Sequence, residues 1–179
     1  DKKAPYGTQV PLMVRWPRVL GKVPKQIGER VQNIDLAPTL CHVAGCAMGP
    51  FPDGSLRADG VSLLPLLTGE RKTLRRKAVI TSYQDAARVP RYWSVTSTGS
   101  SPLAGKGCSR RKREACRWQY TIYETGETEL YDLSNGPCHV WNRAGKGDPC
   151  MLNNKAGKPR YAAIERALRQ ELRRRTPLP

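Results

Sequence analysis

The chain has 179 residues, of which 31 are Lys or Arg and 15 are Asp or Glu, so its formal net charge is +16. This length suits one domain, or one small domain with a piece of another. No run approaches the ~18 apolar residues of a membrane-spanning helix, and no apolar stretch at the start indicates a signal peptide. The charge favours polyanionic partners, but no zinc finger, RNP motif or helix-turn-helix accompanies it, which disfavours nucleic acid.

The first part of the chain predicts the end of an α/β layer. Residues 10–17 are a short apolar run closed by a proline, which is typical of a buried strand. After a loop rich in Gly, Lys and Pro, either Asn33 or Asp35 can cap a helix that ends at Gly45. The apolar stripe of this helix consists of Leu36, Leu40 and Val43. Residues 60–69 then predict a compact apolar turn of helix.

From residue 78 onward the pattern changes to short strands and a final helix. Four β-branched or aromatic segments predict strands over residues 79–83, 92–96, 118–123 and 129–133. Gly126 lies between the last two segments, which favours a hairpin. The predicted final helix spans residues 161–175, with Ile164, Leu168 and Leu172 at four-residue spacing on one face.

These elements predict a fold of class α/β, with an α+β tail. We expect residues 1–67 to be the end of an α/β domain and residues 68–77 to be a linker. Residues 78–179 should then form a small subdomain, in which about four antiparallel strands carry a C-terminal helix.

Six cysteines, an even number, favour disulfides in an oxidising compartment. No C-x-x-C pair is present, and the two histidines do not complete a zinc ligand set. Cysteine pairs that close short loops in polar segments predict two local disulfides, Cys108–Cys116 and Cys138–Cys150. Cys41 and Cys46 flank the end of one helix, either as buried thiols or as a strained pair.

The basic residues are concentrated in three places: residues 71–77, residues 110–113, and Arg169 with residues 173–175. Within the second cluster, the candidates for binding a polyanion are Arg110, Arg111, Lys112 and Arg113. The alternative interpretation is a solvated basic surface with no dedicated ligand.

Several short motifs follow one another in the order found in one enzyme family. They are KKAPY at residues 2–6, VPLMVRWP at 10–17, NIDLAPTL at 33–40, DGVSLLPLL at 59–67 and GETELYDL at 126–133. Together they resemble the type I sulfatases of the alkaline phosphatase superfamily, such as the N-acetylglucosamine-6-sulfatase-like and arylsulfatase-like enzymes. The chain departs from the family pattern at Gly7, Gly136 and His139, where the family has acidic residues.

The resemblance implies a sulfuric ester hydrolase that acts on a sulfated sugar, glycan or aryl sulfate. It also implies a calcium ion and a formylglycine nucleophile, which is made from Cys or Ser within C/S-x-P/A-x-R. None of the six cysteines has this context, and the family's metal ligands precede the KKAPY segment. We therefore expect the nucleophile and the metal site in a missing N-terminal portion, and no activity from this chain alone. By the same resemblance, Lys2 contacts the substrate sulfate.

The resemblance and the cysteine count together predict a secreted, periplasmic or lysosomal-type compartment. Two other functions remain open from the sequence. One is a non-catalytic module that binds a sulfated glycan through its basic loop, and the other is a catalytically dead relative of the sulfatases.

Overall fold

The computed structural model describes residues 8, 10–21, 25–46, 48–49, 59–85, 89–98, 117–133 and 151–176. The chain divides into two compact units. We call Leu12–Arg75 the helical unit, and Arg76–Pro179 together with Asp1–Pro11 the sheet–helix unit. Each unit is described separately.

The sheet–helix unit contains a four-stranded antiparallel sheet in the order β1-β2-β3-β4. The strands are β1 (Ala78–Tyr83), β2 (Tyr92–Ser97), β3 (Trp118–Tyr123) and β4 (Thr128–Asp132). A hairpin joins β3 to β4, and Gly126 has a φ of 89° in its turn, a conformation that favours glycine. The predicted strands and hairpin are confirmed, because the β-branched and aromatic runs are bounded by turn residues.

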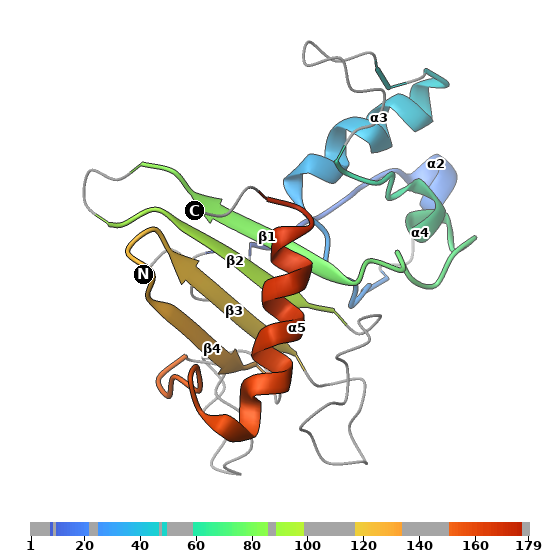
Figure 1. The fold of residues 1–179 in the computed structure, drawn as a ribbon. Helices are drawn as coiled ribbons and strands as arrows, with labels where there is room; N and C mark the ends of the chain where they lie inside the picture. The colour runs from blue at the N-terminus through green and yellow to red at the C-terminus, as the bar shows by residue number, and fades with distance from the viewer. Residues whose placement is uncertain are drawn as a thin grey trace. The chain divides into compact units, whose positions relative to one another are not determined.

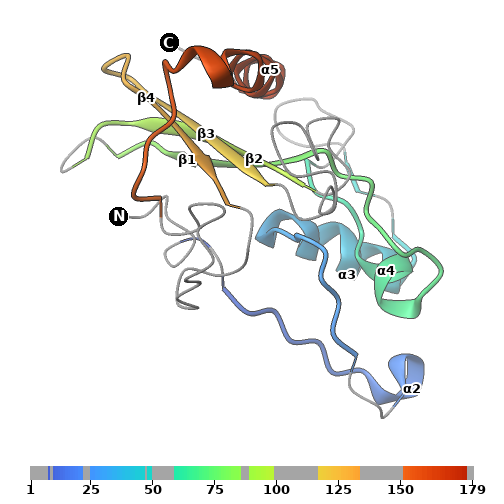
Figure 2. The ribbon, with the colours of Figure 1, turned by 90° about the horizontal axis from the view of Figure 1, so that it is seen from below.

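The C-terminal helix covers one face of this sheet (Figures 1 and 2). A 3-10 turn, η3 (Pro159–Tyr161), leads into α5 (Ala162–Arg173), as the four-residue apolar spacing predicts. From α5, Ile164, Leu168 and Leu172 are buried against the sheet. The sheet contributes Ala78, Val95, Trp118, Tyr120, Ile122 and Leu130 to the same core. Alternation along each strand brings these side chains to one face.

The opposite face of the sheet is unusual because its buried side chains are mostly polar. Directly opposed residues pair across the strands: the Thr121 hydroxyl lies 3.0 Å from the Ser94 hydroxyl. Farther along the same two strands, the Thr96 hydroxyl lies 3.4 Å from Gln119 Oε1. Such cross-strand pairs stabilise a sheet while satisfying the polar groups that burial removes from water.

The helical unit is built from short helices. They are α2 (Pro17–Leu20), η1 (Asn33–Asp35), α3 (Leu36–Ala44) and α4 (Leu64–Thr68). Gly45 and Gly69 end α3 and α4 in the left-handed conformation, with φ of 70° and 85°. These helix ends were predicted from the glycines, which adopt positive φ without the steric penalty of a Cβ.

One expectation for this part of the chain is wrong. Residues 10–14 form no strand, and the side chains of Val10 and Met13 are 78% and 90% exposed. A buried strand needs neighbours for its backbone groups and for both of its faces, and no described segment pairs with this one. The apolar stripe of α3 is exposed in this structure, with Leu40 at 68%, whereas Cys41 is the residue of α3 that is buried.

Candidate functional site

The predicted site residues fall outside the described residues. This is true of Lys2, of the cluster Arg110, Arg111, Lys112 and Arg113, and of the cysteines Cys108, Cys116, Cys138 and Cys150. Their roles and pairings therefore stay predictions. The described residues instead show how two of the motif segments, NIDLAPTL and DGVSLLPLL, are joined.

Asp35 forms the centre of this junction. Its side chain has no exposed surface. Oδ2 accepts a hydrogen bond from the Gln32 N–H at 2.8 Å, and Oδ1 accepts one from the Val61 N–H at 2.9 Å. The carboxylate thus closes the η1 turn with one oxygen and holds the DGVSLLPLL segment with the other. Both bonds are charge-assisted, which makes them stronger than neutral ones.

The prediction that Asn33 or Asp35 caps the helix holds for Asp35 in a modified form. As the residue that precedes α3, Asp35 makes no side-chain capping bond to that helix, but it is the third residue of η1 and completes a capping box with Gln32, the residue before the turn. Its carboxylate also accepts the N–H of Val61. A helix cap and a long-range hydrogen bond to backbone use the same residue type, because both need a short side chain with an acceptor oxygen.

Three further contacts strengthen the junction. Thr39 Oγ1 donates to the Asp35 carbonyl at 2.6 Å and accepts from the Leu63 N–H at 2.8 Å. His42 Nδ1 lies 2.9 Å from Ser62 Oγ. Gly60 packs so tightly that a Cβ there would lie 2.0 Å from the Ile34 carbonyl oxygen, so only glycine fits. The two motifs are one structural unit, not two independent signals.

The disulfide Cys41–Cys46 lies at the end of α3. The sequence left open whether these two cysteines are thiols or a pair, and the structure pairs them. Both cysteines of the described residues are therefore oxidised. The bond crosslinks the last turn of α3 to the residue after its glycine cap, which fixes this helix end.

The junction does not have the character of a catalytic or metal site. No group of three or more His, Cys, Asp or Glu side chains gathers among the described residues, and both oxygens of Asp35 are occupied by backbone N–H groups. These residues do not fit the calcium site that the family resemblance implies, so no metal-dependent step is derived from them. Nor is any helix in the described part of the chain long and apolar enough to cross a membrane.

An open depression of about 340 Å³ lies on the surface of the helical unit. It is lined by Gln26, Ile27, Gly28, Glu29, Leu66, Arg71 and Lys72. The carboxylate of Glu29 accepts a hydrogen bond from the Leu74 N–H at 3.3 Å. This contact joins a lining residue of the depression to the chain after α4.

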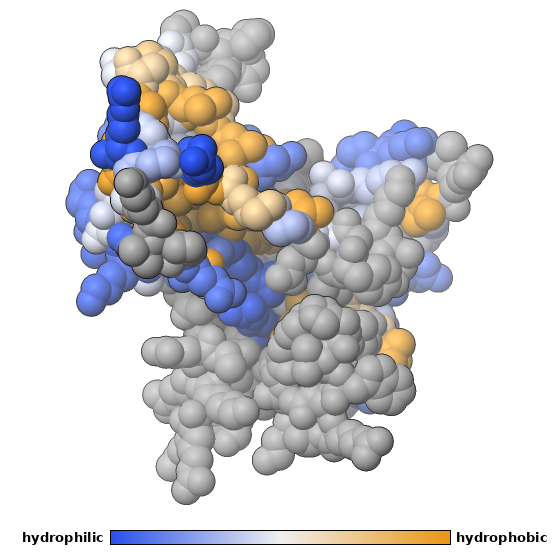
Figure 3. Space-filling view, turned by 180° about the vertical axis from the view of Figure 1, so that it is seen from behind, coloured by the Kyte–Doolittle hydropathy of each residue, from blue (hydrophilic) through white to orange (hydrophobic). Residues whose placement is uncertain are grey.

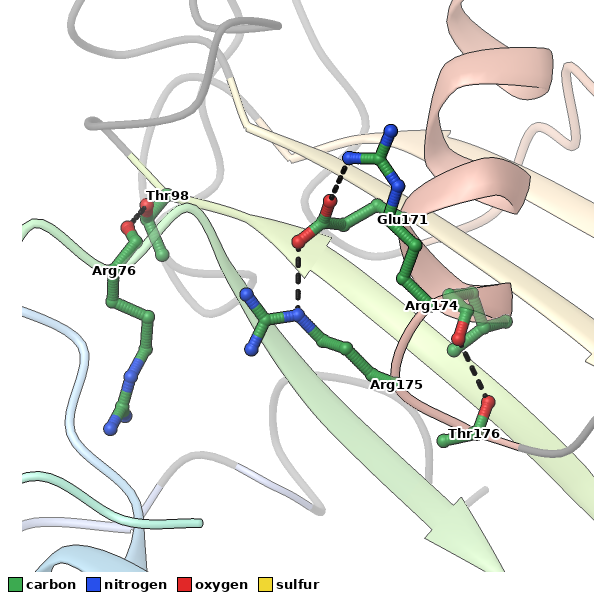
Figure 4. A network of polar contacts seen from close by, with 7 residues as sticks. Arg76, Thr98, Glu171, Arg174, Arg175 and Thr176 are labelled. Carbon is green, nitrogen blue, oxygen red and sulfur yellow. Dashed lines mark hydrogen bonds and ion pairs between the residues drawn. The ribbon is translucent and has the colours of Figure 1, made fainter. Parts of the chain in front are cut away.

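In the sheet–helix unit, polar contacts gather at the end of α5 (Figure 4). Glu171 pairs with Arg175 at 2.9 Å and with Arg174 at 3.8 Å. Thr176 Oγ1 donates to the Leu172 carbonyl at 3.0 Å. These contacts lie at the C-terminal end of α5, and the carboxylate of Glu171 forms both of the ion pairs.

Tyr120 has a phenol whose pKa is raised above its usual value. Its side chain is completely buried, and its hydroxyl has no hydrogen-bond partner in the described structure. Burial raises the pKa of the phenol above its usual value of 10.0, an effect that the positive charge of Arg169 partly offsets. The phenol lies in the core beneath α5 and has the character of a structural group, not of a general acid.

The comparison with protein families identifies the class. Residues 1–99 match the family described as N-sulphoglucosamine sulphohydrolase, C-terminal. The match covers more than half of the chain and includes both joined motifs. The chain therefore belongs to this sulfatase family, as a C-terminal region.

Individual relatives agree with this assignment. The N-acetylglucosamine-6-sulfatases of Bos taurus and Homo sapiens are each 30% identical over 181 residues, which covers 90% of this chain. The chain spans 30% of the length of these relatives. A solved structure described as a 2-O GAG sulfatase is similar at a TM-score of 0.49 and 24% identity, covering 78% of this chain and 23% of that one.

Sequence reasoning missed three features of the described residues: the tie from Asp35 to Val61, the tight contact at Gly60 and the arrangement of charges on α5. The residues of the first two features stand in the motifs, Asp35 in NIDLAPTL and Gly60 in DGVSLLPLL. However, neither motif indicates that it contacts the other.

Proposed function

We propose that this chain is the C-terminal part of a sulfatase that hydrolyses the sulfate ester of a sulfated sugar. The observation that carries the proposal is the 30% identity to N-acetylglucosamine-6-sulfatases over 90% of the chain. The described residues have a structural role in it: the Asp35 junction holds the motif segments together, and the sheet–helix unit forms a small closing subdomain.

The chemistry of the proposed reaction requires groups that the described residues do not hold. In the family, formylglycine supplies the nucleophile and calcium supplies fixed positive charge opposite the sulfuryl group. The contribution assigned to this chain is Lys2, whose ammonium would lie within hydrogen-bonding reach of the sulfate. As negative charge grows on the leaving oxygen, such a donor stabilises the transition state more than the ground state.

The test uses the intact protein that contains this chain, assayed on N-acetylglucosamine 6-sulfate and on an aryl sulfate. Lys2→Ala should lower kcat/KM about 10²–10³-fold, the usual loss for one donor to a developing charge. Lys3→Ala is the matched control, since it lies one position off the K-x-x-P-Y frame and should change kcat/KM less than about threefold. Equal effects of the two substitutions would contradict the assignment of Lys2.

The proposal also covers activity and location. We expect no sulfatase activity from the 179 residues alone, because none of their cysteines lies in C-x-P/A-x-R. Turnover of either substrate by the isolated chain would contradict this. We propose a secreted, periplasmic or lysosomal-type location for the protein, which the Cys41–Cys46 disulfide supports. A protein that has the upstream motif without Cys or Ser would instead be a catalytically dead relative.

A further inference from the structure

Three arginines form a stripe along the exposed side of α5. Arg166, Arg169 and Arg173 are spaced by three and four residues, which places them on one face of a helix. All three side chains are exposed. From the first to the last, the stripe extends about 10 Å along the helix axis, since each residue adds about 1.5 Å.

No carboxylate of the described residues forms an ion pair with this guanidinium stripe, as we call the three residues. The two carboxylates of α5 have their contacts elsewhere: Glu165 accepts a hydrogen bond from the Gly157 N–H at 3.0 Å, and Glu171 pairs with Arg174 and Arg175 (Figure 4). Among the described residues, none makes an ion pair with Arg166, Arg169 or Arg173. The partial negative charge at the helix end favours Arg173, but Arg166 lies in the first half of α5, where this effect has faded.

The surroundings of the stripe exclude two kinds of polyanion. A helix that binds a membrane inserts its apolar face, and the apolar face of α5 is occupied by the sheet: Leu168 is 1% exposed and Leu172 is 0% exposed. A surface that binds single-stranded nucleic acid offers aromatic side chains on which bases stack. The exposed residues of α5 are only alanine, arginine and glutamine.

Linear polymers with sulfate and carboxylate groups are the polyanions that fit both the stripe and the sulfatase family of this chain. A single sulfated sugar cannot engage three cations spread over about 10 Å, whereas a polymer with repeated anionic groups can. The planar fork of arginine also matches planar or tetrahedral oxyanions better than the ammonium of lysine, and all three positions are arginine.

We propose that the guanidinium stripe of α5 is a binding surface for a linear sulfated polysaccharide. The choice of a sulfated polymer rests on the proposed function, while the binding itself requires no catalysis. The surface would hold the polymer by several weak ionic contacts, so its affinity should fall steeply as salt is added.

The test measures binding of the full chain to heparin, a sulfated polysaccharide, at several salt concentrations. The stripe variant is Arg166→Gln with Arg169→Gln and Arg173→Gln. The matched control is Arg71→Gln with Lys72→Gln and Arg75→Gln, which removes the same charge from three exposed residues of the helical unit. We expect the stripe variant to bind at least about tenfold more weakly at 0.1 M salt, and the control to bind less than about threefold more weakly.

A third variant separates fork geometry from charge. Arg166→Lys with Arg169→Lys and Arg173→Lys keeps the charge, and we expect it to bind heparin more weakly than the unchanged chain but more tightly than the glutamine variant. Equal losses in the stripe variant and the matched control would overturn the proposal, because binding would then follow net charge alone. Binding to single-stranded DNA that matches binding to heparin would overturn the choice of polymer.

Failure of the stripe proposal and failure of the proposed function give different results. If the intact protein desulfates sugars but its stripe variant still binds heparin normally, the stripe proposal fails and the proposed function stands. If heparin binding depends on the stripe but the intact protein has no sulfatase activity, the proposed function fails and the stripe proposal stands.

Discussion

The two units of this chain are stabilised in different ways. The sheet–helix unit buries a continuous apolar core, in which Val95, Trp118, Tyr120, Leu130 and Leu172 are each 0% exposed. The helical unit buries few apolar side chains and leaves most of its large ones in solvent, as Figure 3 shows on one face. These are Leu12, Met13, Val14, Val19, Ile27, Ile34, Leu36, Leu40, Val43 and Val61.

The difference shows what each unit depends on. Burial of apolar surface stabilises the sheet–helix unit, at roughly 25 cal/mol per Å². The helical unit depends on directed bonds: the carboxylate of Asp35, the hydroxyl of Thr39 and the Cys41–Cys46 disulfide. Exposed apolar surface on this scale is typical of a face that packs against other protein. Substitutions that act on one unit alone can test the contrast.

The largest effect is expected at Asp35. Asp35→Ala removes two charge-assisted hydrogen bonds, from the N–H groups of Gln32 and Val61, which should destabilise the helical unit by about 4 kcal/mol. Hydrogen exchange at the amides of Val61 and Leu63 should accelerate, while exchange in β3 stays unchanged. Asp59→Ala, at the exposed Asp of the neighbouring motif, is the control and should change stability by less than about 0.5 kcal/mol. Faster exchange in both units would show that they unfold together.

The complementary substitution is Leu168→Ala in the sheet–helix unit. Leu168 is 1% exposed, and its loss should cost about 3 kcal/mol through lost burial and the cavity left behind. Exchange should accelerate at the amides of β2 and β3 and remain unchanged in α3. Leu152→Ala, at a side chain that is 86% exposed, should be nearly neutral. A cost near zero for Leu168→Ala would contradict the core described for this unit.

Removing the disulfide should have a smaller effect on the helical unit. Cys41→Ser combined with Cys46→Ser opens a short loop, which predicts a loss of about 2 kcal/mol in the chain-entropy model. Exchange at the amides near Gly45 reports this loss. Reductant should accelerate exchange there in the unchanged chain and have no further effect in the double variant. If the double variant still responds at these amides, the local crosslink is not the cause.

The smallest effect at neutral pH is expected for Tyr120→Phe. Removing a buried hydroxyl that has no hydrogen-bond partner in the described structure should stabilise the sheet–helix unit by about 0–1 kcal/mol. Burial raises the pKa of Tyr120, so the folded state holds this proton more tightly than the unfolded state. The stability that the protonated Tyr120 contributes is therefore fully present below about pH 10, and it is lost as the pH rises through the folded-state pKa.

The pH dependence separates this variant from the unchanged chain. Denaturant unfolding between about pH 9 and 11 should show a smaller loss of stability in Tyr120→Phe. Tyr83→Phe, at a half-buried tyrosine of the same sheet, controls for the loss of a phenol elsewhere. Identical alkaline slopes in Tyr120→Phe and the unchanged chain would contradict the role assigned to burial.

Sequence alone was sufficient for the elements whose signal is local. Runs of β-branched and aromatic residues predicted all four strands, and the spacing of Ile164, Leu168 and Leu172 predicted α5 and its buried face. Gly45 and Gly69 predicted where α3 and α4 end. Periodicity and helix-end signals depend only on neighbouring residues, so they can be recognised without knowing what packs against them.

Tertiary structure decided everything that depends on a distant partner. Asp35 fits a helix cap locally, and its bond to Val61, 26 residues away, exists only in the fold. Residues 10–14 have the composition of a buried strand, yet burial needs a neighbouring strand that no local pattern supplies. The three arginines of the α5 stripe face solvent because Ile164, Leu168 and Leu172 place the other side of the helix on the sheet. Periodicity predicts which face of a helix or strand a side chain lies on. The residue that this side chain contacts depends on segments far away in the sequence.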